Sequence, residues 1–190
     1  MNIYLVRHGE KIPKKGDPGL SETGKKQAQN LGRHFKNINI DQFVSSPTKR
    51  SIETSDFISI EITKPYSVDA RLKERLNFGD VKSQTYSEFL NELEKSTKNR
   101  NYILQNGVSS ISKGKMVEEL IREKNETNDD IILVFHSSAI IDFLRNVVEG
   151  VEEKYLHNNL NSNNIIKCGA YVMLKYDKNG YKILKFNVEP

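Results

Sequence analysis

The hydrophobic positions of this chain fall into short apolar runs that alternate with longer segments of helical period. Short runs at Ile3–Val6 and Phe43–Ser46 predict strands, and Pro47 ends the second of them. Five consecutive apolar residues, Ile131–Phe135, lie between acidic residues and His136, which is typical of a strand buried on both faces. We therefore expect this third strand at the centre of a sheet.

Between and after these runs, apolar residues recur every three or four positions, as they do on the buried face of a helix. The segments with this period span residues 21–36, 48–59, 86–98, 115–125 and Ser137 to Gly150. In the last segment we expect Ser137 and Ser138 to cap the helix and Gly150 to end it.

Three further segments have weaker patterns. Ile60–Val68 alternates but contains Pro65, so it is at best an edge strand. Residues 157–164 are rich in asparagine and predict a loop. The runs Ile165–Leu174 and Tyr181–Val188 flank turn residues at 177–180, which indicates a closing hairpin.

This order of strand, loop and helix predicts an α/β fold. We expect a three-layer α/β/α sandwich with a mostly parallel central sheet, and a single domain over residues 1–190, because no internal repeat or linker is visible. The polar segment at about 82–114 is a possible cap or lid over a site.

Composition narrows the classes of protein. The formal charge is +4 over 190 residues, and no stretch is apolar enough to cross a membrane or to form a signal peptide. The basic residues are spread widely without a nucleic-acid-binding motif, so we expect neither nucleic acid nor membrane as a partner. Cys168, the single cysteine, predicts no internal disulfide and a cytoplasmic location, and we interpret it as a small buried residue. Oligomeric state is not readable from the sequence.

The chemistry-bearing residues follow the predicted strands. Arg7 and His8 end the first strand, Arg50 lies just past the second, and His136 ends the central one. Ligands of open α/β sheets bind beyond the carboxyl ends of the strands, so we expect these side chains at one edge. Two imidazoles and two guanidiniums suit a dianionic phosphoryl group, because phosphoryl transfer depends on positioning and on neutralising the charge of the oxygens.

These residues stand in a longer ordered pattern: Leu5-Val6-Arg7-His8-Gly9-Glu10, then Ser45-Ser46-Pro47 leading to Arg50 and Thr54. The pattern continues through Asp17, Leu20, Thr23, Gly24, Gln27 and Ala28, through the Arg71–Arg75 segment, and to His136. In this order it resembles the histidine phosphatase superfamily, which includes phosphoglycerate mutases and many small phosphatases. The similarity extends across most of the chain.

The resemblance implies a role for each matching residue. It implies that His8 is the nucleophile that becomes phosphorylated, that Arg7, Arg50 and His136 hold the phosphoryl oxygens, and that Glu74 is the proton donor. It also implies a phosphate contact for Thr23, for which an ordinary place in the first turn of a helix is an equally open reading.

The same assignment can be argued from chemistry. Neighbouring guanidiniums disfavour a protonated imidazole and leave His8 free to attack phosphorus. A protonated Glu74 can donate to the departing alkoxide, and its carboxylate can then activate the water that hydrolyses the phosphohistidine. Because arginines supply the counter-charge, we expect no metal and no cofactor.

Two departures from the family pattern concern the mouth of the site. Ser137 stands where the family usually has glycine, and the first loop lacks a common asparagine and carries Lys11, Lys14 and Lys15 instead. These lysines could attract anions, or they could form an ordinary solvated loop.

The expected activity is hydrolysis of small phosphomonoesters, as by a histidine acid phosphatase. We prefer a phosphatase to a cofactor-dependent phosphoglycerate mutase because the chain is compact, whereas a mutase needs additional chain to shield its intermediate from water. A phosphate-binding regulatory module without turnover is a further alternative.

Overall fold

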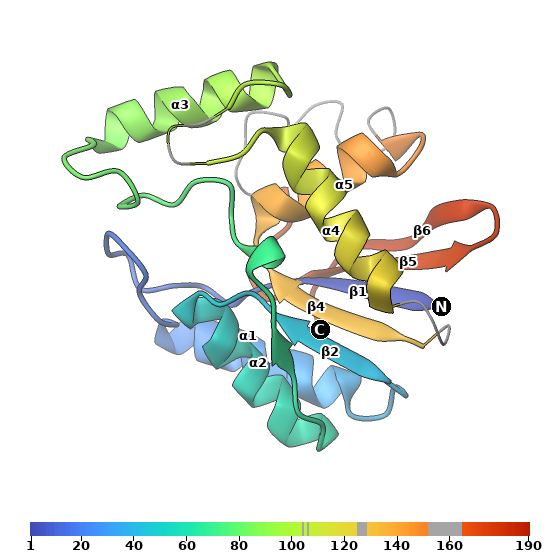
Figure 1. The fold of residues 1–190 in the computed structure, drawn as a ribbon. Helices are drawn as coiled ribbons and strands as arrows, with labels where there is room; N and C mark the ends of the chain where they lie inside the picture. Colours follow the sequence, from blue (N-terminus) through green and yellow to red (C-terminus); the bar gives the residue numbers. More distant parts are fainter. Residues whose placement is uncertain (104, 106, 125–128, 152–164) are drawn as a thin grey trace.

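The computed structural model describes residues 1–103, 105, 107–124, 129–151 and 165–190, so the predicted loop at 157–164 lies outside the described residues. Its core is a six-stranded sheet with the strand order β3-β2-β4-β1-β5-β6 (Figure 1). The strands are β1 (Asn2–Arg7), β2 (Gln42–Ser45), β3 (Ser67–Val68), β4 (Ile131–Phe135), β5 (Tyr171–Asp177) and β6 (Gly180–Val188).

The strands β3, β2, β4 and β1 are parallel, whereas β5 pairs antiparallel with β1 and with β6. The mostly parallel sheet with a closing hairpin is therefore confirmed. The central strand β4 is buried along its whole length, as its unbroken apolar run predicts.

The register of the strands aligns the carboxyl ends of β1, β4 and β2. Arg7 lies opposite Phe135, and Ser45 lies opposite Val134, so β1, β4 and β2 end at the same edge of the sheet. The residues that follow these strands consequently meet at that edge.

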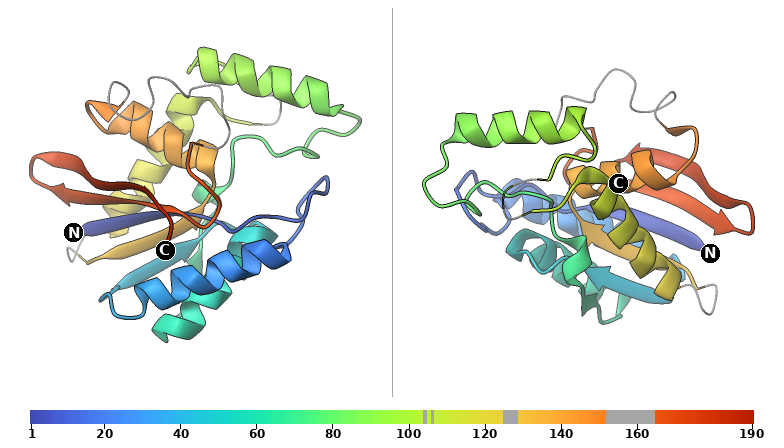
Figure 2. Two further views of the ribbon diagram at one scale, coloured as in Figure 1. Left: turned by 180° about the vertical axis from the view of Figure 1, so that it is seen from behind. Right: turned by 45° about the horizontal axis from the view of Figure 1, so that its top comes forward.

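Helices cover both faces of the sheet (Figure 2). On one face lie α1 (Glu22–Phe35) and α2 (Lys49–Ile62), and on the other lie α4 (Ser110–Lys124) and α5 (Ser137–Val147). Alternate residues of β1 point to opposite faces, so Leu5 packs with the α4 and α5 side and Tyr4 packs with the α1 side. The predicted three-layer sandwich is confirmed.

A fifth helix, α3 (Tyr86–Lys98), stands apart from the sheet beyond the carboxyl ends of its strands (Figure 1). It follows a short 3-10 helix, Ala70–Leu72, and a connecting segment. Thr85 and Glu88 form a reciprocal capping box at its start. Its buried residues Phe89 and Leu93 form a small apolar cluster with Leu76, separate from the two main cores.

Several predicted boundaries differ from the structure. Helix α2 continues past the expected end at residue 59, and α4 begins at Ser110 rather than at residue 115. The first turn of α4 buries Ser110, Lys113 and Gly114, which do not produce an apolar pattern. Strand β5 begins at Tyr171 rather than Ile165.

The expected capping of α5 by its serines is wrong. His136 is the N-cap residue and no side-chain hydrogen bond caps this end. Ser138 donates its hydroxyl to Glu74 instead, at 3.0 Å. Within the described part of the chain, no helix has the length and apolar character needed to span a membrane.

Candidate active site

His8 follows β1 directly and has a single well-defined tautomer. Its backbone N–H donates to Phe135 O at 3.0 Å, which fixes the residue at the edge of the sheet. Its Nδ1 lies 2.7 Å from Gly9 O. A carbonyl oxygen only accepts, so Nδ1 carries the proton and Nε2 presents its lone pair. Arg50 Nε donates to that Nε2 at 3.1 Å, in agreement with this assignment.

The imidazole of His8 is neutral at ordinary pH. The residue is only 5% exposed. Burial, followed by the charges of Arg50 and Arg7, lowers the pKa of His8 well below its ordinary value of 6.5. A neutral ring with an unprotonated Nε2 is the form that attacks phosphorus.

Arg50 lies at the centre of the site. It belongs to the first turn of α2 and is 1% exposed. Besides His8, its guanidinium contacts Glu74 Oε2 at 3.1 Å from Nη2, His136 Nδ1 at 3.3 Å from Nη2, and Asp17 Oδ1 at 3.2 Å from Nη1. A buried guanidinium with two carboxylates around it is electrostatically balanced, and its planar donors remain suited to phosphate oxygens.

Asp17 holds the start of α2 as well as Arg50. Its carboxylate accepts the Lys49 backbone N–H, at 3.1 Å to Oδ1 and 3.0 Å to Oδ2. A negative charge at a helix N-terminus is favourable. Sequence reasoning noted Asp17 within the family pattern but assigned it no partner.

His136 follows the central strand and is 0% exposed. Its ring centroid lies 5.1 Å from that of His8. Arg50 donates to its Nδ1, so its Nε2 carries the proton and lies 3.0 Å from Ser46 Oγ and 3.4 Å from Thr48 Oγ1. Burial, followed by the neighbouring His8 and Arg50, lowers the pKa of His136 well below 6.5. The hydroxyls of Ser46 and Thr48 orient this ring. Sequence reasoning named Ser46 within the family pattern but assigned it no partner, and it did not identify Thr48.

Glu74 lies next to both Arg50 and His136. It follows the 3-10 helix, and its Oε1 accepts the Ser138 hydroxyl at 3.0 Å. Its Oε2 lies 3.9 Å from His136 Nδ1. Its side chain is 26% exposed, so the carboxyl is reachable from the cavity while two fixed donors hold it.

These side chains converge on a cavity of about 270 Å³. Four of the six predicted site residues line it: Arg7, His8, Arg50 and Glu74. His136 lies behind them in contact with His8 and Arg50. The remaining lining residues are Glu10, Lys11, Leu76, Phe89, Leu93, Ser137 and Cys168.

Thr23 and Cys168 differ in their position relative to the cavity. Thr23 is exposed in the first turn of α1 and does not line the cavity. Cys168 is only partly buried and contributes to the cavity wall, so its interpretation as an ordinary buried residue is wrong. Burial raises the pKa of the Cys168 thiol. Within the described ranges, no cluster of three or more His, Cys, Asp and Glu residues could hold a metal ion.

Glycine is required beside His8 because the chain passes close to α1. A Cβ on Gly9 would lie 2.4 Å from Gly24 O, and a Cβ on Gly24 would lie 2.0 Å from Glu10 O. The Gly9 N–H donates to Thr54 Oγ1 at 3.1 Å, and that hydroxyl donates to Arg50 O at 2.8 Å. The two glycines thus allow the loop, α1 and α2 to meet around the imidazole.

The three loop lysines have different surroundings. Lys11 lines the cavity, and Lys14 is exposed. Lys15 lies over the ring of Phe78, with its Nζ 4.9 Å from the centroid, and donates to Gln84 O at 3.3 Å. Lys15 therefore joins the first loop to the segment that precedes α3.

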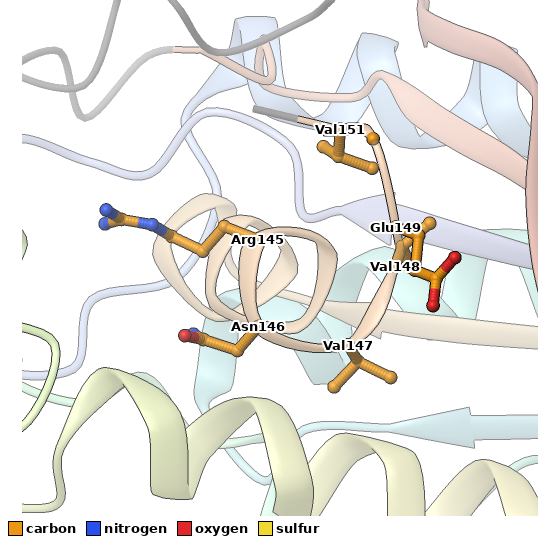
Figure 3. Close-up of a pocket in the computed structure, with 7 residues that line it drawn as sticks. Arg145, Asn146, Val147, Val148, Glu149 and Val151 are labelled. Carbon is orange, nitrogen blue, oxygen red and sulfur yellow. The ribbon is translucent and has the colours of Figure 1, made fainter. Parts of the chain in front are cut away.

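A second hollow, of about 390 Å³, lies at the end of α5 and is lined by residues 145–151 (Figure 3). Arg145 and Glu149 extend in different directions from it. It contains none of the predicted site residues.

Two imidazoles and two arginines at the carboxyl edge of a parallel sheet form a donor set suited to a phosphoryl group. The model of the histidine phosphatase superfamily (branch 1) matches residues 3–189, and the chain belongs to this family. The predicted resemblance is confirmed.

Relatives of the chain include both mutases and phosphatases. A 2,3-bisphosphoglycerate-dependent phosphoglycerate mutase from Thermoplasma acidophilum is 35% identical over 97 residues, which cover 47% of this chain and 48% of the mutase. The uncharacterized phosphatase PhoE from Bacillus subtilis is 33% identical over 93 residues, which cover 45% of this chain and 48% of PhoE. The matched stretch thus spans about half the length of these two curated relatives.

Among solved structures, a phosphoserine phosphatase from Entamoeba histolytica in complex with 3-phosphoglyceric acid superimposes with a TM-score of 0.74 at 22% identity, covering 98% of this chain and 96% of that one. At this identity the likeness concerns the fold.

Proposed function

We propose that the protein is a metal-independent hydrolase of small phosphomonoesters that acts through a phosphohistidine at His8. The observation that supports this most directly is the neutral His8 ring, whose Nε2 lone pair is aimed at Arg50 in the wall of the cavity. The proposal also agrees with the phosphatases among the relatives and with the single cysteine, for which a cytoplasmic location is the simplest setting.

In the first step, His8 Nε2 forms a bond to phosphorus and the bond from phosphorus to the ester oxygen breaks. Arg7, Arg50 and His136 surround the charge that develops on the phosphoryl oxygens. Glu74, which lies beside Arg50, acts in this step as the acid in its protonated form. Glu74 then donates this proton to the departing alkoxide.

In the second step, a water molecule attacks the phosphohistidine. The Glu74 carboxylate accepts a proton from this water, the bond between nitrogen and phosphorus breaks, and inorganic phosphate leaves. His8 returns to its neutral form. The arginines provide counter-charge in both steps, which is why no metal is needed in this scheme.

Hydrolysis of para-nitrophenyl phosphate in the presence of a chelator tests the proposal. We expect turnover by the wild-type chain and a loss of about 10³-fold or more in His8→Ala, because the covalent step is removed. His34→Ala is the matched control, since His34 lies on α1 and its Nε2 bonds to Tyr171 Oη, away from the cavity.

Rapid quenching of the wild-type reaction should trap an acid-labile phosphate adduct on His8. Equal rates for wild type and His8→Ala would exclude the enzymatic proposal and favour a binding module. Isomerisation of 3-phosphoglycerate as the dominant reaction would favour a mutase instead.

A further inference from the structure

The cavity has two chemically distinct ends. At one end, which we call the phosphoryl end, Arg7 and Arg50 line the cavity together with His8, and the proposed mechanism places both arginines on the phosphoryl oxygens. The apolar wall of the cavity consists of Leu76 and, on α3, Phe89 and Leu93, with exposures of 3%, 9% and 8%. These three residues form their own apolar cluster, separate from the two cores that pack on the sheet.

Glu74 connects the two ends. Its carboxyl contacts Arg50, and Leu76 follows it by two residues into the apolar wall. In the mechanism above, Glu74 donates to the ester oxygen, so that oxygen lies beside Glu74. The carbon skeleton attached to it therefore extends toward Leu76, Phe89 and Leu93.

The apolar wall is held in place relative to His8. The first loop bonds to the segment that carries the wall, through Gly16 N–H to Phe78 O at 2.9 Å and Asn77 Nδ2 to Gly16 O at 2.8 Å. Phe78 and Phe89 pack with their ring centroids 5.5 Å apart. These contacts fix the distance between the phosphoryl end and the apolar wall, because they join the first loop to the segment before α3 and that segment to α3.

The cations of the cavity are concentrated at the phosphoryl end. Lys11 is close enough to Arg50, Glu74 and Asp17 for their charges to act on its ammonium group. It belongs to this end rather than to the wall formed by α3. A second phosphate or a carboxylate on the substrate would consequently face leucine and phenylalanine side chains, where an anion is costly to bury.

We propose that the site selects phosphomonoesters of small apolar alcohols, and that Leu76, Phe89 and Leu93 bind the apolar part. This inference rests on the proposed function and specifies its substrate class. The cavity of about 270 Å³ is at the small end of ligand pockets, for which about 300–1,000 Å³ is typical, so the apolar part is about the size of one ring.

A comparison of three alkyl phosphates tests this class. Benzyl phosphate and glycerol 1-phosphate both release an alkoxide, and they differ mainly in the polarity of the alcohol. 3-Phosphoglycerate adds a carboxylate. We expect kcat/KM for benzyl phosphate to exceed both others at least about tenfold, the scale of discrimination that an apolar pocket provides. A smaller ratio overturns the inference.

A positive charge placed in the apolar wall should weaken the preference for an apolar substrate over an anionic one. In Leu93→Lys we expect the ratio of kcat/KM for benzyl phosphate over 3-phosphoglycerate to fall at least about tenfold. Leu90→Lys is the matched control, because Leu90 lies on the same helix but is 40% exposed and does not line the cavity. It should leave the ratio within about twofold. Equal changes in the two variants would indicate a general charge effect and would contradict the assigned wall.

A third variant covers the case in which Leu93→Lys does not fold, which its thermal melting would reveal. In Leu93→Ala we expect KM for benzyl phosphate to rise about tenfold and KM for glycerol 1-phosphate to stay unchanged. The same rise for both esters overturns the inference. His8→Ala distinguishes a failure of the proposed function from a failure of the substrate class. Activity that survives this change refutes the proposed function. Activity that needs His8 but is unaffected by the changes in the apolar wall refutes the substrate class alone.

Discussion

Two imidazoles, His8 and His136, are kept neutral first by burial and then by neighbouring charges, among them Arg50, which also orients both rings. Arg50 donates to a ring nitrogen of each, and this leaves one tautomer for each ring. Because the cation donates to both rings, protonation of either would place positive charges against each other in a buried site. Basicity at the attacking nitrogen is therefore lowered, and the ring stays available for attack on phosphorus over a wide range of pH.

The role of Glu74 as proton donor can be tested with two substrates whose leaving groups differ in their need for a proton. Glu74→Gln keeps the hydrogen-bonding shape but cannot transfer a proton. We expect it to slow hydrolysis of glycerol 1-phosphate about 10²-fold or more, since an alkoxide needs the proton. The value of kcat/KM for para-nitrophenyl phosphate should fall much less, because it reports the steps through release of the leaving group, and nitrophenolate leaves without protonation. Hydrolysis of the phosphohistidine, which also uses Glu74, does not enter this constant. The measurement is the ratio of kcat/KM for the two esters.

The control for this variant is Glu92→Gln. Glu92 lies on α3, where it bonds to Lys95 and Tyr102 rather than to the site residues. Its replacement should leave the ratio of the two esters unchanged. A Glu74→Gln variant that slows both esters equally would argue against proton donation by this residue.

The sequence identified the residues that follow strands, but not those that orient them. His8, Arg50 and His136 were predictable because strand ends in a parallel sheet meet at one edge. Ser46 and Ser138, which hold His136 and Glu74, were not predictable as partners. A serine hydroxyl bonds equally well to its own backbone in turns and caps, so its long-range partner depends on packing that a sequence pattern does not contain.

At the scale of elements, the helical spacing of apolar residues predicted the bounds of a helix well where the buried residues of that helix are apolar. The predicted range of α3 agrees with the structure at both ends. The start of α4 was misplaced because Ser110 and Lys113 are buried there through polar contacts. Ser110 donates to Asp142 Oδ1 at 2.6 Å, and Lys113 donates to Arg71 O at 3.2 Å. A helix turn buried by such contacts has no hydrophobic signature.

These contacts belong to a buried junction between the Glu74 segment and the helices α4 and α5. Arg75 is paired with Asp142 across this junction, and their side chains are 4% and 1% exposed. Asp142→Asn keeps the shape of the side chain but leaves the Arg75 charge buried without its partner. We expect the free energy of unfolding to fall by about 3–5 kcal/mol, as for other broken buried pairs.

Denaturation in urea measures this change. The control is Glu22→Gln, since Glu22 pairs with Lys25 on the surface and its side chain is 84% exposed. Exposed pairs contribute little, so this variant should unfold at the same urea concentration as wild type. An Asp142→Asn chain as stable as wild type would show that the junction is held by packing and not by the ion pair.

At the scale of the whole molecule, the sandwich brings the buried polar groups of the candidate site to one edge of the sheet. His8, Arg50 and His136 are all within a few per cent of full burial there. The general architecture follows from alternating strands and helices, and the sequence predicted it. The placement of α3 over the cavity depends on contacts such as Gly16 with Phe78, which join segments far apart in the chain and leave no local pattern.

The buried imidazoles should make the whole fold sensitive to mild acid. The folded-state pKa of His8 and of His136 lies well below 6.5, whereas in the unfolded chain both return to about 6.5. Below that pH the unfolded chain binds more protons than the folded one, so stability is complete above pH 6.5 and falls as the pH is lowered. We expect the melting temperature of wild type to drop between pH 7.5 and pH 5.5, a window above the usual range of carboxylate titration.

The double variant with His8→Gln and His136→Gln should show a shallower drop, because its site gains no proton on unfolding. Parallel curves for the two proteins would mean that other groups control the acid response and that the imidazoles are not held neutral by the fold.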